Sequence, residues 1–489
     1  MRGFYICAMS PYLILSLVAA YFAVLFVISW LTSRQADNNT FFTGKRSSPW
    51  YVVAFGMIGA SLSGVTFISV PGWVNGSNFS YMQTVLGYLV GYLIIAKVLL
   101  PLYYKLNLTS IYSYLGSRFG DSSYLTGAWF FLVSRMLGSA FRLYIVADVL
   151  QFSVFDNLGV PFFFTVAISL GLIMLYTFKG GIKTIVYTDT FQTFFLLLAV
   201  VLTVYFIKDS ILLPGQGLAG YIWESSNSQI FFFDNFLSDS RHFIKQFVGG
   251  MFIAISMTGL DQDMMQKNLT CKNLGEAQKN MYTFSVSLIF VNFLFLSLGV
   301  LLYAYAGQLG ITAVGDKLFP AIALGGTLGA AVGVFFIIGL IAAAYSSADS
   351  ALTALTTSFC IDILKIERDA DEAHAQKSRK RVHFAMAIMM LLIIVFSRPY
   401  VSDNIIKTIF EIAGYTYGPL LGMFFFGLFT KFDVKDKWVP LVAIASPLVT
   451  LGLKILAKST FGYAMSFELL LLNGGITFLG LLFLIQKKN

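Results

Sequence analysis

Long runs of apolar residues, separated by short polar segments, follow one another from residue 11 to the end of the chain. A helix needs about 20 apolar residues to cross the roughly 30 Å of hydrocarbon in a bilayer. The pattern therefore predicts an all-α polytopic membrane protein with about thirteen transmembrane helices. The first run has no small-residue cleavage pattern, so we expect it to be retained as a helix. The predicted spans are 11–31, 50–74, 82–104, 123–150, 160–178, 185–207, 244–266, 281–306, 328–360, 383–397, 404–429, 438–456 and 465–486.

The composition excludes several other classes of protein. Charged residues make up 12% of the 489 residues, and hydrophobic residues make up 57%. An average soluble domain contains about 25% charged residues, so a soluble fold of this size could not cover its surface. Three cysteines and three histidines are too few for a disulfide scaffold, a Cys/His zinc site or haem ligation. We therefore expect no cofactor.

The positions of the basic residues predict how the chain crosses the membrane. Twenty-one of the 33 Lys and Arg residues fall in one set of loops, and six fall in the set that includes the N-terminus. Because cytoplasmic loops carry the excess of positive charge, we expect the N-terminus outside and the C-terminus inside the plasma (inner) membrane. The net charge of +9 then reflects topology, and the partner is the lipid bilayer, not nucleic acid.

A few ionisable residues lie deep within the predicted spans, where they are costly and are candidates for function. They include Arg135, Arg142, Asp189 and Asp349. The span 328–360 adds a cluster of hydroxyl groups around its carboxylate. Oxygens of this kind suit a weakly bound monovalent cation, because a divalent cation would call for more carboxylates. The clustered hydroxyls are Ser346, Ser347 and Ser350.

The spans 50–74 and 244–266 are both interrupted by glycine and hydroxyl residues. Matched interruptions in two inverted halves are typical of secondary transporters, where unwound carbonyls bind the ion and half-helix ends meet the substrate. The alternative is that these glycines only allow helices to pack closely. That alternative explains one interrupted span, but it explains two matched spans less well. The expected organisation is an extra helix with a loop (1–49), a first repeat (50–207), an outer loop (208–243), a second repeat (244–430) and two final helices (431–489).

Five segments, in order along the chain, resemble the signatures of the sodium:solute symporter family, which includes bacterial sugar and sialic acid symporters and animal sodium–glucose cotransporters. The resemblance covers about residues 40–430 and implies a LeuT-type fold of five plus five inverted helices, cation-coupled alternating access and no enzymatic activity. The segments are Ser-Leu-Ser-Gly-Val-Thr-Phe-Ile-Ser (61–69), Gly-Gly-x5-Tyr-Thr-Asp-x-x-Gln (180–192), Asp-Gln-Asp-Met-Met-Gln-Lys (261–267), Ala-x-x-Ser-Ser (343–347) and Gly-Tyr-Thr-Tyr-Gly-Pro (414–419).

The resemblance also implies site residues. The main sodium site would use carbonyl and hydroxyl oxygens of Gly59, Leu62, Ala343, Ser346 and Ser347. A second cation site would fall on Asp189, Asp349 and Ser350. Asp349 stands where a hydroxyl is expected in the sialic acid symporters. It could strengthen a second sodium site, or it could carry a proton instead. Substrate contacts would come from Ser61, Ser63, Thr66, Gln83, Arg135, Arg142 and Glu411.

The two arginines of span 123–150 suggest a carboxylate in the substrate. The arginine that meets the substrate carboxylate in the sialic acid symporters aligns with Gly138. Arg135 and Arg142 flank that position at −3 and +4, on the same helical face, so either could take its role. The alternative for Arg135 is an ion pair with Asp148 or Glu411.

We thus predict a sodium-coupled symporter of a small polar solute, functional as a monomer. A sugar or sugar acid is the first expectation, a monocarboxylate or vitamin-like anion the second, and an amino acid the third. A membrane-embedded enzyme would need a nucleophile–base pair or a metal cluster at depth, and an ion channel would need a repeated filter loop. The sequence favours neither.

Overall fold

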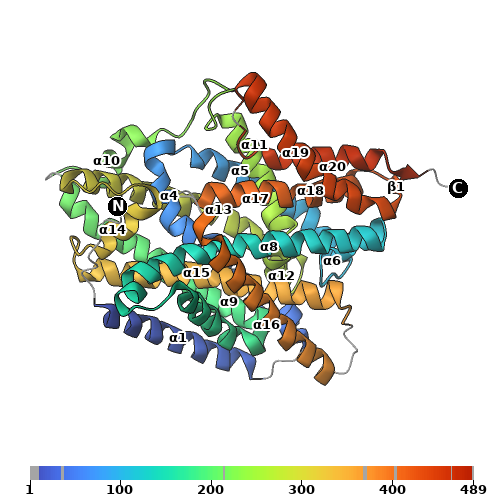
Figure 1. Ribbon diagram of the computed structural model, residues 1–489, viewed down its shortest axis with the longest axis horizontal. Helices are drawn as coiled ribbons and strands as arrows, with labels where there is room; N and C mark the ends of the chain where they lie inside the picture. The colour runs from blue at the N-terminus through green and yellow to red at the C-terminus, as the bar shows by residue number, and fades with distance from the viewer. Residues whose placement is uncertain are drawn as a thin grey trace.

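The computed structural model describes residues 10–34, 38–212, 215–366, 372–400, 405–463 and 465–486, and most of them are helical (Figure 1). Within these residues, eight helices are long and apolar enough to cross a membrane, or 11 if each bent pair of helices counts as one span. Two shorter apolar helices, Phe162–Phe178 and Leu469–Leu482, coincide with two further predicted spans. The described part of the chain thus confirms a polytopic helical protein.

The helices follow one another through short connections. The first ten are α1 (Pro11–Ser33), α2 (Asn38–Thr43), α3 (Trp50–Ser61), α4 (Gly64–Ser77), α5 (Tyr81–Ile94), α6 (Leu100–Lys105), α7 (Ser113–Arg118), α8 (Asp121–Leu150), α9 (Phe162–Ile211) and α10 (Leu218–Glu224). The later ones are α11 (Phe243–Ala254), α12 (Gln262–Asn268), α13 (Leu274–Leu309), α14 (Leu318–Leu324), α15 (Ala330–Ser358), α16 (Glu372–Ser397), α17 (Ile405–Thr416), α18 (Gly418–Phe429), α19 (Val439–Phe461) and α20 (Leu469–Leu482). A short antiparallel pair joins β1 (Asp433–Val434) to β2 (Ile485–Gln486).

Three spans are broken in the part of the chain that the structure describes. The bend is 58° between α3 and α4, 70° between α11 and α12, and 43° between α17 and α18. The backbone leaves the helix at Leu62 (ψ 85°) and is extended at Ser63. Asp261 caps α12, because its carboxylate accepts hydrogen bonds from the backbone N–H groups of Asp263 and Met264 at 2.9 and 3.2 Å. The first two breaks lie in the spans where the sequence predicted interruptions.

Two details of the chain path depart from the simple pattern. Pro71 lies inside α4, where the helix continues, and the backbone unwinds nine residues earlier, at Leu62. The predicted spans 160–178 and 185–207 are joined without a loop, through a kink in α9 at Gly181 (φ 52°). A Cβ atom at Gly181 would meet the ring and carbonyl of Phe41. Only glycine suits both this conformation and this close approach.

The helices form two groups that meet at the first break. The helices α4, α5, α11 and α13 pack together, and α8, α9, α15 and α16 pack together. Small residues let the backbones approach closely, as in other membrane helices. For example, a Cβ atom at Gly250 of α11 would collide with the backbone of Thr84 in α5. Between the groups, Gly56 and Gly59 place α3 directly against Asp189 and Thr193 of α9.

One end of the molecule carries the loops with Lys105, Lys272, Lys365 and Lys435. We call this end the lysine-rich side. In Figure 1 it lies at the right, near α6, α12 and the C-terminus, and many of the long helices run from it toward the opposite end. Its identity as the cytoplasmic side, and the division into repeats over 50–207 and 244–430, stay predictions.

Candidate functional site

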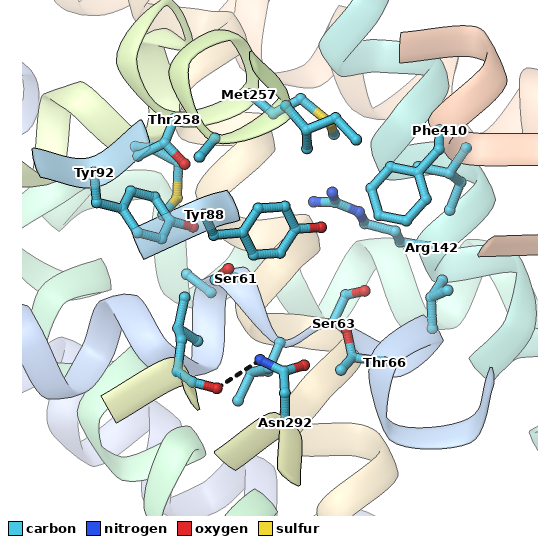
Figure 2. Close-up of a pocket in the computed structure, with 18 of the residues that line it drawn as sticks. Ser61, Ser63, Thr66, Tyr88, Tyr92, Arg142, Met257, Thr258, Asn292 and Phe410 are labelled. Atoms are coloured by element: carbon cyan, nitrogen blue, oxygen red, sulfur yellow. Dashed lines mark hydrogen bonds between the residues drawn. The ribbon is translucent and has the colours of Figure 1, made fainter. Parts of the chain in front are cut away.

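A cavity of about 80 Å³ lies beside the break between α3 and α4 (Figure 2). Its walls come from both helix groups, with α5, α11 and α13 of the first and α8 of the second, and α17 adds Ile409 and Phe410. The π-helical turn Ile255–Gly259, which follows α11, also lines it. The two interrupted spans therefore meet at one cavity, where a solute could touch both.

Hydroxyl groups cover one part of the wall. Ser61, Ser63 and Thr66, all predicted to contact the substrate, line the cavity. They flank the unwound residues, where backbone groups are freed from helical hydrogen bonds. Ser63 and Thr66 are buried in the protein, so a solute that reaches them must leave its water behind. Their hydroxyls can then both donate and accept hydrogen bonds.

Three tyrosines of α5 form the wall opposite. Tyr81, Tyr88 and Tyr92 line the cavity, and the hydroxyls of Tyr81 and Tyr88 are 3.3 Å apart. Figure 2 shows the ring of Tyr88 reaching into the middle of the cavity. These three tyrosines were not among the substrate contacts predicted from the sequence. The available signal was their spacing of seven and four, which places all three on one helical face.

The two arginines of α8 both line the cavity but differ in their partners. Arg135 pairs with Asp263 and lies 3.9 Å from Asp261. Arg142 donates to the hydroxyl of Ser347 at 3.4 Å, and among the described residues no carboxylate lies within ion-pair distance of it. Arg142 therefore brings to the cavity a positive charge that has no ion-pair partner among the described residues.

The acids proposed as partners for Arg135 pair with other bases. Asp148 lies 3.7 Å from Arg398, and Glu411 pairs with Lys454 of α19. The expectation of an ion pair for Arg135 is thus correct, but its partners are the two acids at the start of α12. Glu411, predicted to contact the substrate, does not line the cavity.

A chain of buried charges leads from Arg135 to α15. Lys267 of α12 lies 3.8 Å from Asp263 and 2.8 Å from Asp189. The side chain of Lys267 is only 1% exposed, although the sequence analysis counted it among the loop lysines. Asp189 in turn accepts a hydrogen bond from Ser346 at 2.7 Å. Positive and negative charges therefore alternate from the cavity to the hydroxyl cluster of α15.

Comparison with known proteins gives this arrangement a family. The family model described as "Sodium:solute symporter family" matches residues 41–432. The chain belongs to the sodium:solute symporter family. The symporter is similar to the sodium-coupled monocarboxylate transporter 2 of Danio rerio, with 26% identity over 84% of this chain and 67% of that protein. It is also similar to the sodium/sialic acid symporter NanT of Aliivibrio fischeri, with 25% identity over 84% of this chain and 81% of that protein.

A solved structure shows the same fold. It is the substrate-bound outward-open state of a Na⁺-coupled sialic acid symporter, with a TM-score of 0.81 and 19% identity, and it covers 97% of this chain and 99% of the other. This similarity shows the fold, and the family match over residues 41–432 confirms the membership that the motifs predicted.

In the symporter, the residues predicted for the main sodium site lie on two elements that touch. Gly59 and Leu62 end α3, and Ala343, Ser346 and Ser347 lie on α15; all five are buried. A Cβ atom at Gly64, just after the break, would lie 3.8 Å from Ala344. The residue that follows the break therefore lies against the turn of α15 that begins this set of residues.

The residues predicted for the second cation site already have partners. Asp189 pairs with Lys267, and Ser350 donates to Asp189 at 3.4 Å. Asp349 accepts hydrogen bonds from the Tyr176 hydroxyl at 2.6 Å and from the Ser350 backbone N–H at 2.5 Å. The ammonium group of Lys267 thus already pairs with Asp189, one of the two carboxylates of the predicted site.

Gln83 lies outside the cavity lining. Its amide donates to the Arg241 carbonyl at 2.8 Å and accepts from the Phe232 N–H at 3.2 Å, so it ties the start of α5 to the loop before α11. In that loop, hydrogen bonds from Arg241 hold the pKa of the Asp239 carboxyl below its usual range. Gln83 thus connects α5 to this loop and lies outside the cavity lining, although the sequence predicted that it contacts the substrate.

Proposed function

We propose that the symporter couples sodium entry to the uptake of a small hydroxylated carboxylate, with a sugar acid as the first candidate. The observation that carries this proposal is the position of Arg142, whose guanidinium lines the cavity without a carboxylate partner among the described residues. A guanidinium binds a carboxylate through charge-assisted, often paired hydrogen bonds. A solute carboxylate would therefore supply the missing negative charge.

The rest of the cavity supports a solute that carries hydroxyl groups. Ser61, Ser63 and Thr66 face the hydroxyls of Tyr88 and Tyr92 across it. Sugar hydroxyls can exchange hydrogen bonds with these hydroxyls, and apolar residues that also line the cavity, such as Met257 and Phe410, can pack against the carbon skeleton of a solute. The relatives named above move monocarboxylates and sialic acid, so a carboxylate is common to both. A simple monocarboxylate remains the second candidate.

We place the coupling sodium ion between the break and α15. The carbonyls of Gly59, Leu62 and Ala343 and the hydroxyls of Ser346 and Ser347 would coordinate it. Leu62 has left the helical conformation, so its carbonyl has no fixed helical role, and neutral oxygens of this kind suit a hard cation. Binding there would hold the break against α15.

The position of Ser347 suggests how the two ligands assist each other. Its hydroxyl lies 3.4 Å from Arg142 and would also bind sodium. Two positive charges this close repel each other unless an anion lies between them. A solute carboxylate would favour sodium binding, and sodium would favour the solute, by the same factor. Such couplings are typically about 5- to 150-fold.

A second cation at Asp189, Asp349 and Ser350 would require Lys267 to move away, since Lys267 already neutralises Asp189. We therefore propose one sodium ion per solute while α12 holds its present position.

We also propose a monomer in the plasma (inner) membrane, with the lysine-rich side in the cytoplasm.

The proposal is tested by uptake into proteoliposomes with an imposed sodium gradient. The panel contains labelled sugar acids, neutral sugars, short monocarboxylates and amino acids. We expect saturable uptake of a sugar acid that disappears when potassium replaces sodium or when the gradient is collapsed. Uptake of neutral sugars alone, or uptake driven equally by a proton gradient without sodium, would contradict the proposal.

Replacing Ser347 by alanine is expected to raise the sodium concentration for half-maximal uptake tens-fold, because one coordinating hydroxyl is lost; a 30-fold change corresponds to about 2 kcal/mol. The matched control is Ser358→Ala, about three turns along α15. Its hydroxyl donates to Asp362 and is assigned to neither cation site. An unchanged sodium dependence in Ser347→Ala, or equal effects of both variants, would argue against the assignment.

A further inference from the structure

Asn292, in the middle of α13, has an unused hydrogen-bond acceptor in the cavity wall. The side chain lines the cavity and is 2% exposed. Its Nδ2 donates to the backbone carbonyl of Leu288 at 2.7 Å, which fixes the orientation of the amide. Its Oδ1 has no hydrogen-bond partner. A buried acceptor left unpaired costs about 1–3 kcal/mol, so this position favours a donor that comes from outside the chain.

The surroundings show which part of a solute would reach this oxygen. Figure 2 shows Asn292 and Arg142 in different parts of the cavity, with Ser63 and Thr66 between them in this view. The amide nitrogen faces Leu288, and the oxygen is on the other side of the amide group. A solute whose carboxylate meets Arg142 would therefore extend its remaining atoms along the hydroxyl-lined wall toward Asn292.

We propose that Asn292 determines substrate specificity by accepting a hydrogen bond from a hydroxyl or N–H group of the solute, at the end away from its carboxylate. This inference rests on the proposed binding of a carboxylate at Arg142. Asn292 then selects hydroxylated acids over acids of the same shape that carry no donor. An unsubstituted acid leaves Oδ1 buried and unpaired, and sites built to hydrogen-bond a substrate group discriminate strongly against analogues that lack it.

The same geometry disfavours a second carboxylate on the solute. The Oδ1 atom can only accept, and the Nδ2 donor is engaged by Leu288. A carboxylate oxygen placed there would face another acceptor without a proton between them. The site is thus expected to prefer polyhydroxy monoacids over diacids of similar size.

The test compares two probes that share a six-membered ring and one carboxylate. Glucuronate carries hydroxyl groups, and cyclohexanecarboxylate carries none. Binding of each to the purified full-length symporter is measured by calorimetry at saturating sodium, for the unchanged protein and for Asn292→Leu. The quantity compared is the ratio of the two affinities, because a general loss of folded protein lowers the binding of both probes without changing that ratio.

We expect the unchanged protein to bind glucuronate at least tenfold more tightly than cyclohexanecarboxylate, and Asn292→Leu to reduce this ratio at least tenfold. The matched control is Asn280→Leu in the same helix. Asn280 also has an unpaired Oδ1 but does not line the cavity, so its replacement should leave the ratio unchanged.

Two results would overturn the inference in distinguishable ways. A ratio that stays high in Asn292→Leu, or that falls equally in Asn280→Leu, removes the role of Asn292 and leaves the proposed function intact. Sodium-dependent binding of neither acid to the unchanged protein, together with binding of a neutral sugar, removes the proposed carboxylate and the inference with it.

Discussion

Replacing Arg142 by glutamine is expected to lower kcat/KM for sodium-driven uptake of a carboxylate at least about 100-fold. Removing one partner of a buried ion pair costs about 3–5 kcal/mol, because the remaining charge is left without a partner. Each 1.4 kcal/mol corresponds to a factor of ten. Sodium binding in the absence of solute should not weaken, and it should tighten, since a positive charge is removed beside Ser347.

The conservative variant Arg142→Lys provides the control. It keeps the charge but loses the planar arrangement of donors that matches a carboxylate. Its carboxylate uptake should therefore lie between that of the unchanged protein and that of Arg142→Gln. Uptake and sodium binding are measured on the same proteoliposome preparations. Carboxylate uptake by Arg142→Gln at the original rate would refute the assignment of Arg142. Equal loss of sodium and solute binding would indicate damage to the fold instead.

Replacing Lys267 by glutamine is expected to destabilise the symporter strongly, by about 3–5 kcal/mol for an unpaired buried charge. Asp189 would keep only hydrogen bonds from Ser346 and Ser350. Asp189→Asn should be milder, because Lys267 still has Asp263 at 3.8 Å. The double variant should be more stable than the sum of the single changes predicts, since it leaves neither charge facing an empty position.

These differences are measured as thermal unfolding midpoints of the purified proteins in detergent. Thr203→Ala in α9 is the control, because Thr203 is buried in the same helix as Asp189 and lies outside the charge chain. Additive effects of the two single changes, within error, would show that the Lys267–Asp189 contact contributes nothing specific. A more stable Lys267→Gln variant would contradict the pairing altogether.

The sequence predicted the fold through patterns that depend on local chemistry. Apolar run lengths reveal spans, and the glycine and hydroxyl residues around Leu62 reveal a helix that cannot continue unbroken. The family resemblance, not local chemistry, named Ser61, Ser63 and Thr66 as substrate contacts, and all three line one cavity because they flank that break. The spans and the break need only the neighbours of each residue along the chain.

The remaining site residues depend on how distant helices pack. Lys267 belongs to a loop by its sequence position, and only the 70° bend before α12 buries it against Asp189. Glu411 and Arg135 are both ionisable residues at membrane depth, and only the packing of α17 against α19 and of α8 against α12 shows which acid each base meets. Asn292 has no motif around it. The unpaired Oδ1 of Asn292 can be recognised only in the folded structure, where α13 lines the cavity.

The charge chain through Arg135, Asp263, Lys267 and Asp189 has a consequence for how the lysine-rich side opens. It fastens α12 to α8 and α9 with ion pairs in place of apolar contacts. Separated charges of this kind are costly when dry, but hydration compensates for them once water enters. The first water molecules to arrive would therefore make further opening easier. In the alternating access expected of the symporter, separating these ion pairs would expose charged groups, not apolar ones, to water.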